Sequence, residues 1–245
     1  MKISVLASGS KGNCTYLETE NHRILIDLGM TTKYIEEKLM TLDVDPKTID
    51  SVFLTHDHKD HISALKVFQK RYNPNIYLTE KLEQSLCIDN CTYLLTNNEI
   101  DSLKITVIKT SHDATDSVGF IFEEHEKSVV YITDTGYINV KYKDVLKNHN
   151  LYVLESNHDI EMLMNGRYRY DLKVRILGDR GHLSNEMATS YLEEIIGEKT
   201  STIILAHLSE ENNTEELAYQ MITSKIKDKN IIIAKQNERT GLIEL

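Results

Sequence analysis

The 245-residue sequence has only 2 prolines and 10 glycines, and it contains no tract rich in serine, glutamine or proline. These shortages argue against a flexible linker or a low-complexity tail. No apolar run approaches the roughly 20 residues that a membrane-spanning helix needs. The start of the chain, Met1–Leu6, lacks the long apolar core of a signal peptide and is typical of a first strand. We therefore expect one domain, residues 1–245, located in the cytoplasm and not associated with a membrane.

Cysteine is also scarce, and the three cysteines form no regular framework. We expect Cys14, Cys87 and Cys91 to be buried, reduced thiols rather than parts of a disulfide or a metal site. The formal net charge of -10 argues against a broad surface for nucleic-acid phosphates. A nucleic-acid enzyme stays compatible with this charge, because bound metal ions and a local basic patch can attract phosphates.

Apolar, β-branched runs alternate along the chain with amphipathic stretches. The runs predict strands at Ile3–Leu6, Arg23–Asp27, Ser51–Leu54, Asn75–Leu78, Lys104–Ile108, Val118–Glu123, Ser128–Thr133, Leu151–Leu154, Thr202–Ala206 and Ile231–Ala234. The amphipathic stretches predict helices over residues 34–42, from Ile62 onwards, and over residues 187–196 and 214–222. Ser184 or Asn185 can cap the third of these helices, and Thr214 can start the fourth. Two groups of strands with helices after each predict a mixed α/β fold, and we find no internal repeat.

The most informative segment follows the predicted strand Ser51–Leu54 and contains His56, His58, Asp60 and His61. Because alternate residues of an extended segment project to the same side, His56 and His58 can hold one metal ion together. Asp60 and His61 come at the start of the next predicted helix, from which they can address a second ion. The alternative is a solvated polar turn, which three histidines and an aspartate in six residues make a poor explanation. Imidazole and carboxylate ligands together suit Zn, Mn or Fe.

Three further candidate ligands stand at the ends of later predicted strands. His112 follows the strand that includes Val107 and Ile108, Asp134 closes Ser128–Thr133, and His207 closes Thr202–Ala206. A single residue of this kind is more often part of a polar loop. Three of them at successive strand ends are expected to converge on the metal motif.

Together these residues resemble the metallo-β-lactamase superfamily, and the resemblance runs along essentially the whole chain. It implies an αββα four-layer sandwich, in which two sheets pack face to face between outer layers of helices. The superfamily pattern assigns His56, His58 and His112 to one metal ion, Asp60, His61 and His207 to a second, and Asp134 to both. His58 stands where oxygen-reducing diiron relatives carry glutamate, which favours hydrolysis over redox chemistry. Two such divalent ions about 3.5–4 Å apart can hold a bridging hydroxide and neutralise charge on a substrate oxygen.

Three segments, residues 154–159, 181–185 and 206–213, are similar to the YycJ/WalJ group of this superfamily in Gram-positive bacteria. This resemblance implies a metal-dependent phosphodiesterase that acts as a DNA exonuclease, with 5′ to 3′ polarity favoured over 3′ to 5′. The segments around His182 and His207 are also similar to the tRNA-processing RNase Z enzymes. The sequence has neither an inserted β-CASP domain nor a long flexible arm, so DNA trimming fits better than tRNA maturation. Oligomeric state stays open.

The catalytic candidates are Asp60, His182 and Glu155. His182 matches a position that RNase Z-like enzymes use to protonate the leaving oxygen, and Glu155 could orient it. A polar residue at a helix start is the alternative for His182, of about equal weight. The candidates for substrate contacts near the site are Asn157, His158, Ser184 and Asn185, with a structural role in loops as the alternative. The other histidines, His22, His125 and His149, are expected at the surface.

The one clear basic cluster of this acidic chain comprises Arg167, Tyr168, Arg169 and Arg175, with Arg180 beyond it. Arginine for phosphate and tyrosine for base stacking are the residue types that contact single-stranded nucleic acid. The alternative is an ordinary solvated loop. The position of the cluster between two candidate active-site segments favours a contact with substrate.

Two other classes of function remain to be considered. A small-molecule hydrolase, such as a glyoxalase II-like thioesterase or a lactonase, would share the metal motif. Such an enzyme should show a short basic site for one small acid rather than a run of arginine and tyrosine. An interaction protein without metals is disfavoured because every ligand position is filled.

Overall fold

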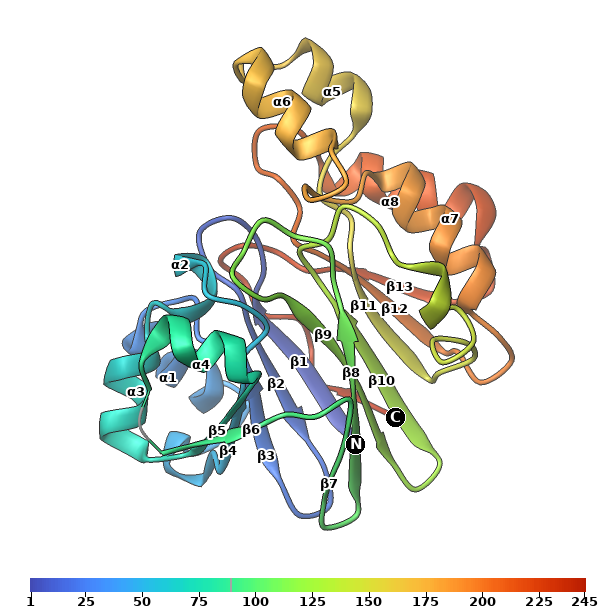
Figure 1. Ribbon diagram of the computed structural model, residues 1–245. Helices are drawn as coiled ribbons and strands as arrows, with labels where there is room; N and C mark the ends of the chain where they lie inside the picture. Colours follow the sequence, from blue (N-terminus) through green and yellow to red (C-terminus); the bar gives the residue numbers. More distant parts are fainter. Residues whose placement is uncertain (89) are drawn as a thin grey trace.

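Two seven-stranded sheets form the centre of the computed structural model, which describes residues 1–88 and 90–245 (Figure 1). The first sheet has the strand order β14 (Ile243–Glu244), β1 (Lys2–Ala7), β2 (Cys14–Glu18), β3 (Arg23–Ile26), β4 (Ser51–Phe53), β5 (Asn75–Leu78) and β6 (Cys91–Tyr93). The second has the order β13 (Asn230–Ile233), β12 (Thr202–Ala206), β11 (Leu151–Glu155), β10 (Lys127–Ile132), β9 (Val118–Glu124), β8 (Leu103–Lys109) and β7 (Asn97–Ile100). Each half of the chain thus builds one sheet, apart from β14, which returns to pair with β1.

Strand directions change in the same way across both sheets. Neighbouring strands are antiparallel from β14 to β3 and parallel from β3 to β6. The second sheet is antiparallel from β7 to β10 and parallel from β10 to β13. The carboxyl ends of the parallel strands therefore gather at one edge of each sheet, which is where open α/β sheets bind their ligands.

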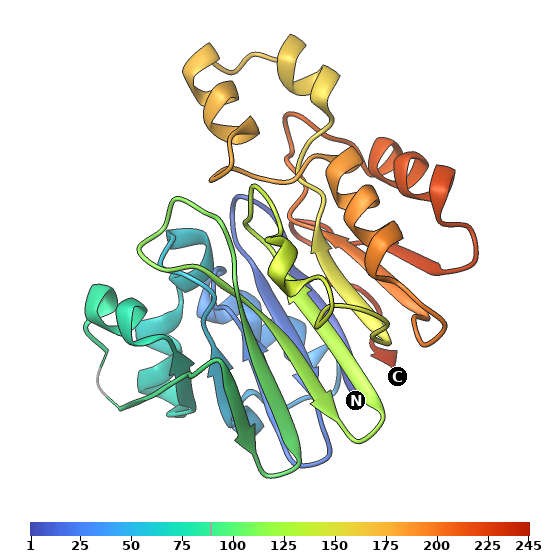
Figure 2. The same ribbon diagram turned by 45° about the vertical axis from the view of Figure 1, so that its right-hand side comes forward.

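Helices cover the outer face of each sheet (Figures 1 and 2). The first sheet is covered by α1 (Thr32–Met40), α3 (Leu65–Tyr72) and α4 (Glu80–Leu86), and the second by α7 (Asn185–Ile195) and α8 (Glu215–Lys225). Apolar side chains fill one layer between the sheets, represented by Ile24 and Phe120. Separate layers lie under the helices of each side, represented by Phe68 and Leu192. This arrangement confirms the αββα sandwich.

The remaining helices lie at the ends of strands or outside the sandwich. They are α2 (Lys59–Ile62), α5 (Ile160–Asn165), α6 (Tyr170–Leu177) and the short 3₁₀ helices η1 (Pro46–Thr48) and η2 (Val140–Tyr142). The α5–α6 segment, residues 159–181, projects from one end of the sandwich between β11 and α7 (Figure 1). The buried ammonium of Lys173 ties its two helices together, because it donates to Met164 O at 2.6 Å and Gly166 O at 2.8 Å.

Most of the predicted elements are present in the structure. Ser184 caps α7 by accepting a hydrogen bond from Met187 N, and Thr214 caps α8 by accepting one from Leu217 N, as the sequence predicts. The expected helix from Ile62 is wrong in its start, because α2 ends there and α3 begins at Leu65. Strands β2, β6, β7 and β14 were not predicted from the sequence. β6 and β7 lie at sheet edges and carry exposed polar residues, and β14 has only two residues, so their apolar pattern is weak.

Two expectations about exposure are wrong. His149 is buried rather than exposed, because it packs in the turn before β11, where its Nε2 bonds to Val145 O at 2.8 Å. Cys87 is exposed rather than buried, since it ends α4 in a left-handed conformation that directs it to solvent. Cys14 is buried as expected. None of the helices in the described part of the chain has the length and apolar character needed to cross a bilayer.

Candidate active site

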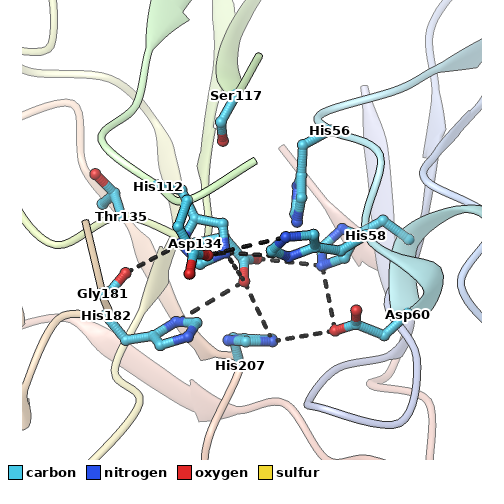
Figure 3. A network of polar contacts seen from close by, with 12 residues as sticks. His56, His58, Asp60, His112, Ser117, Asp134, Thr135, Gly181, His182 and His207 are labelled. Carbon is cyan, nitrogen blue, oxygen red and sulfur yellow. Dashed lines mark hydrogen bonds and ion pairs between the residues drawn. The ribbon is translucent and has the colours of Figure 1, made fainter. Parts of the chain in front are cut away.

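The predicted metal ligands lie together at one end of the sandwich, between the two sheets (Figure 3). The first sheet contributes the segment after β4, with His56, His58, Asp60 and His61. The second sheet contributes single residues from the loops after β8, β10 and β12, which are His112, Asp134 and His207. Residues that are far apart in the sequence therefore converge because their strands end at the same edge.

One group of possible ligands consists of His56, His58 and His112. The Nδ1 atom of His112 lies 3.1 Å from Gly181 O, to which it can donate, so Nε2 carries the lone pair. This Nε2 lies 3.2 Å from His58 Nδ1. The Nε2 of His56 is buried and has no hydrogen-bond partner among the described residues. Three imidazole nitrogens thus face one point, as a shared metal ion requires.

A second group consists of Asp60, His61 and His207, and Asp134 lies between the two groups. His61 Nε2 is 3.6 Å from Asp60 Oδ2 and 3.3 Å from Asp134 Oδ2. His207 Nε2 is 3.8 Å from Asp60 Oδ2 and 3.5 Å from Asp134 Oδ1. Asp134 Oδ1 also lies 3.9 Å from His112 Nε2, so this carboxylate reaches both groups.

Buried carboxylates orient the two histidines of the second group. Asp27 Oδ2 accepts a hydrogen bond from His61 Nδ1 at 2.7 Å, and Glu155 Oε1 accepts one from His207 Nδ1 at 3.0 Å. The Nε2 atoms of His61 and His207 then face the centre of the ligand cluster. A carboxylate behind a metal-binding histidine fixes the tautomer and raises the basicity of the ligating nitrogen. Asp27 was assigned no role in the site from the sequence, although, like Asp134, it stands at the end of a predicted strand.

Three of these residues hold left-handed backbone conformations, with φ of 60° at Asp27, 53° at Asp134 and 56° at His207. Non-glycine residues seldom adopt this region, and such positions gather at functional sites. Asp27 and His207 directly follow the carboxyl ends of β3 and β12, and Asp134 lies two residues after the end of β10. In this conformation the side chain of each residue points towards the gap between the two sheets.

The electrostatics of the cluster favour a cation. Burial holds the pKa of His56 well below its ordinary value and lowers that of His112, so both rings are neutral and able to act as ligands. Burial by itself lowers the pKa of His61, but Asp134 and Asp27 raise it to about 10. The buried Nε2 of His207 and Oδ2 of Asp134 have no hydrogen-bond partner among the described residues. Orphaned polar atoms of this kind cost about 1–3 kcal/mol each, so the donor set fits divalent metal ions.

His182 and Glu155 form a hydrogen-bonded pair beside the candidate metal ligands. Glu155 is fully buried, and its Oε1 accepts from His182 Nδ1 at 2.7 Å. Its other oxygen, Oε2, accepts from the backbone N–H groups of Thr135 and Leu183 at 3.0 and 3.2 Å. Burial raises the pKa of Glu155, but the neighbouring His182 and His207 lower it to about 2. The carboxylate therefore holds His182 by Nδ1 and leaves Nε2 for the cavity.

A cavity of about 280 Å³ opens above this cluster, and its floor includes His58, Asp60, His112, Asp134, His182 and His207. Asn157 lines it and also donates to His207 O at 2.9 Å. His158 is buried and does not line the cavity. Ser184 and Asn185 lie away from the lining as well, since Ser184 caps α7 and Asn185 bonds with Ser156 and Asn213. Their surroundings favour the structural alternative for these three residues.

The basic cluster divides between the cavity and the outer surface. Tyr168, Arg175 and Arg180 line the cavity, whereas Arg167 and Arg169 are exposed outside it. Arg175 Nε donates to Asp113 Oδ2 at 2.5 Å, next to His112. Arg175 lies in α6, whereas Arg167, Tyr168 and Arg169 precede this helix and Arg180 follows it. Asp113, a further lining residue, was not singled out from the sequence.

Comparison with known proteins agrees with the geometry. Residues 22–207 match the family model described as the Beta-lactamase superfamily domain, and the chain belongs to this superfamily. Within it, the chain belongs to the group of the WalJ and YycJ proteins. It is 36% identical over 241 residues to the exodeoxyribonuclease WalJ of Streptococcus pneumoniae, covering 92% of this chain and 88% of the relative. It is 33% identical over 247 residues to the exodeoxyribonuclease YycJ of Bacillus anthracis, covering 97% and 94%. The solved structure of the metallo-β-lactamase fold protein YhfI from Bacillus subtilis matches with a TM-score of 0.75 at 17% identity, over 98% of both chains.

Proposed function

We propose that this chain is a metal-dependent DNA exonuclease whose site holds two divalent ions. The observation that carries the proposal is the pair of donor groups that share Asp134 beneath a cavity bordered by Arg175 and Arg180. The exodeoxyribonuclease relatives support DNA as the substrate. We further propose that residues 1–245 act as a single catalytic domain and that degradation runs from 5′ to 3′.

The ligand assignment follows the two groups of side chains. His56, His58 and His112 would hold one ion, Asp60, His61 and His207 the other, with Asp134 shared. Zn, Mn and Fe all suit this mixture of imidazole and carboxylate. When bound, the ions supply positive charge for the phosphate oxygens and lower the pKa of a bound water.

The remaining chemistry belongs to side chains of the cavity. His182 donates a proton from Nε2 to the leaving oxygen, since its Nδ1 is occupied by Glu155. Glu155 is a positioning residue that fixes the ring and stabilises its protonated form. Asp60, with its side chain 24% exposed to the cavity, helps to keep the reacting water in place.

Asp27→Asn tests the metal assignment through a residue that touches no substrate. Asp27 also accepts from Thr55 N and Thr55 Oγ1, each at 2.8 Å, so its carboxylate fixes the segment that holds the ligands. The amide cannot accept from His61 with full charge, and metal affinity should fall roughly 10–100-fold. Competition with a coloured chelator measures the change.

Asp50→Asn is the matched control for this variant. Asp50 accepts from His22 Nδ1 at 3.1 Å but precedes β4, at the opposite end of the strand from the candidate site. Its replacement should leave metal affinity unchanged. Wild-type affinity in the Asp27 variant would show that His61 is not a ligand oriented by Asp27.

The double variant Arg167→Ala/Arg169→Ala tests the contact with polymer. A chain of charge -10 attracts DNA only locally, so binding should weaken with salt along a shallow slope. The variant should raise KM for DNA and reduce the magnitude of the salt slope by about one per lost contact. Hydrolysis of a small phosphodiester should change little, because both arginines are exposed outside the cavity.

Lys199→Ala/Lys227→Ala supplies a control of equal charge. Both lysines are exposed and precede β12 and β13, at the end of the sheet opposite the site. Equal losses in the two double variants would mean that only net charge matters. An equal loss of activity on DNA and on the small phosphodiester would mean that the arginines act in folding or in the chemical step rather than in binding the polymer.

A small-molecule hydrolase is not favoured, because the curated relatives over most of the chain are nucleases. In the deciding assay, the metal-loaded protein is incubated with duplex DNA labelled at the 5′ or the 3′ end and, in parallel, with a thioester. Cleavage of the thioester alone under Mn or Zn would overturn the nuclease proposal. The order in which the two labels are released gives the polarity.

A further inference from the structure

One wall of the cavity carries a row of apolar side chains. Tyr168, Leu172 and Ile176 line it at intervals of four residues, on one face of α6 and the turn before it. All three are only partly buried, and none belongs to the apolar layers of the sandwich. Metal-assisted hydrolysis of a phosphodiester needs no apolar group, so the proposed chemistry does not explain this face.

The opposite face of the same helix is also apolar but lies outside the cavity. Tyr170 and Val174 are 75% and 51% exposed and do not line it. The helix therefore has two similar apolar faces, and only one of them lines the cavity. Variants of the two faces can therefore be compared with each other within the same helix.

Polar contacts from α6 and from the turn after it hold the wall in place. Lys173 ties α6 to α5, and Arg175 bonds to Asp113 beside His112. Arg180 donates to His112 O at 3.4 Å from the end of the segment. The apolar face and the candidate metal ligands are therefore connected, and their separation is fixed by the fold.

Size limits what this space can take. The volume of about 280 Å³ is just below the roughly 300–1,000 Å³ found for ligand pockets. A space of this size accepts about one nucleotide. With the phosphate at the polar floor, the nucleobase of that nucleotide would meet the apolar wall.

We propose that Tyr168, Leu172 and Ile176 form a subsite that stacks on the nucleobase of the terminal nucleotide, and that the products are mononucleotides. This inference rests on the proposed nuclease function. Stacking of bases on aromatic side chains is sequence-tolerant, because every base offers a π-face. The subsite thus selects for the presence of a base at the DNA end rather than for its identity.

The test uses duplexes that differ only in the terminal nucleotide, which is either normal or an abasic tetrahydrofuran analogue. The intact protein should cleave the normal end with a kcat/KM roughly 5–150-fold higher, the weight of one stacked base. Tyr168→Ala/Leu172→Ala should lose this preference, so that its kcat/KM for the normal end falls to about its kcat/KM for the abasic end. The control Tyr170→Ala/Val174→Ala, on the exposed face, should keep it.

Opposite results would overturn the subsite. The first is that the unaltered protein shows no preference for the normal end over the abasic end. The second is that this preference survives in the Tyr168/Leu172 variant, and the third is that the products are longer than one nucleotide. Equal slowing on both ends would assign the two residues to folding, and thermal unfolding of all variants checks this directly.

A binding experiment separates the subsite from the nuclease proposal. Calorimetry should show tighter binding of deoxyadenosine monophosphate than of deoxyribose 5-phosphate, and the Tyr168/Leu172 variant should abolish the difference. If the protein cleaves no DNA but shows this difference, the nuclease proposal fails and the subsite stands. If DNA is cleaved but both ligands bind equally, the subsite fails alone.

Discussion

Asp134→Ala should remove metal from both proposed positions, reducing occupancy from about two ions per chain towards none. Asp134 is 2% exposed, and its oxygens reach histidines of both donor groups. Burial raises its pKa, but the neighbouring His207 and His61 hold it well below the usual range, so it is a carboxylate. No other carboxylate in the described part of the chain lies within ion-pair distance of histidines of both groups. Nuclease activity should fall by at least about 10²–10³-fold, as when a major electrostatic contact is lost.

Elemental analysis of the purified variant, loaded with zinc and dialysed, measures the occupancy. Asp144→Ala is the control, because Asp144 has a side chain that is 93% exposed and pairs with the nearby Lys147, away from the candidate site. This control should bind as much metal as the unaltered protein. Full double occupancy after Asp134→Ala would contradict the shared position, and loss of one ion alone would assign Asp134 to a single metal.

His182→Ala should leave metal content intact and lower kcat for DNA by roughly 10²–10⁴-fold, the usual weight of a positioned general acid. The effect should shrink with a p-nitrophenyl phosphodiester, because that leaving group departs without needing a proton. KM for DNA should change less than kcat, since the ring acts on the leaving oxygen rather than on binding. Steady-state kinetics on the two substrates give this comparison.

His182 is also close enough to the candidate metal ligands to be a ligand itself. Its Nδ1 lies 3.8 Å from Asp134 Oδ1, and it belongs to a possible ligand group with Asp134, Glu155 and His207. Loss of metal in the variant would therefore make His182 a ligand and put the role of His207 in doubt. His125→Ala, in the exposed β9–β10 hairpin, is the control and should change neither metal nor rate.

Residues close together in the sequence were the easiest to assign. The segment His56–His61 carries the spacing of its ligands in the chain itself, so the pattern alone indicates a metal site. His112, Asp134 and His207 required a further step, because only their positions after predicted strands relate them to that segment. The structure brings all of them together, and the αββα layers are those that the superfamily resemblance implies.

Other features depend on packing and could not be read from the chain. Asp27 looks like an ordinary residue after a strand until His61 is seen to donate to it. Ser184 and Asn185 lie close to His182 in sequence, yet hydrogen bonds turn them into the α7 cap and a buried network. Likewise, the division of the basic cluster between cavity and surface follows from how residues 167–180 fold around the cavity, which a run of arginine and tyrosine does not fix.

The origin of the ligands in both sheets has a consequence for how the protein matures. His61 and His207 are 146 positions apart in the chain, and neither donor group is complete without a residue from each sheet. Contacts across such separations form late, since long loops must close first. In the proposed two-metal site, complete ligand groups would therefore form only after the two sheets have docked. Bound ions would then stabilise the docked state by mass action.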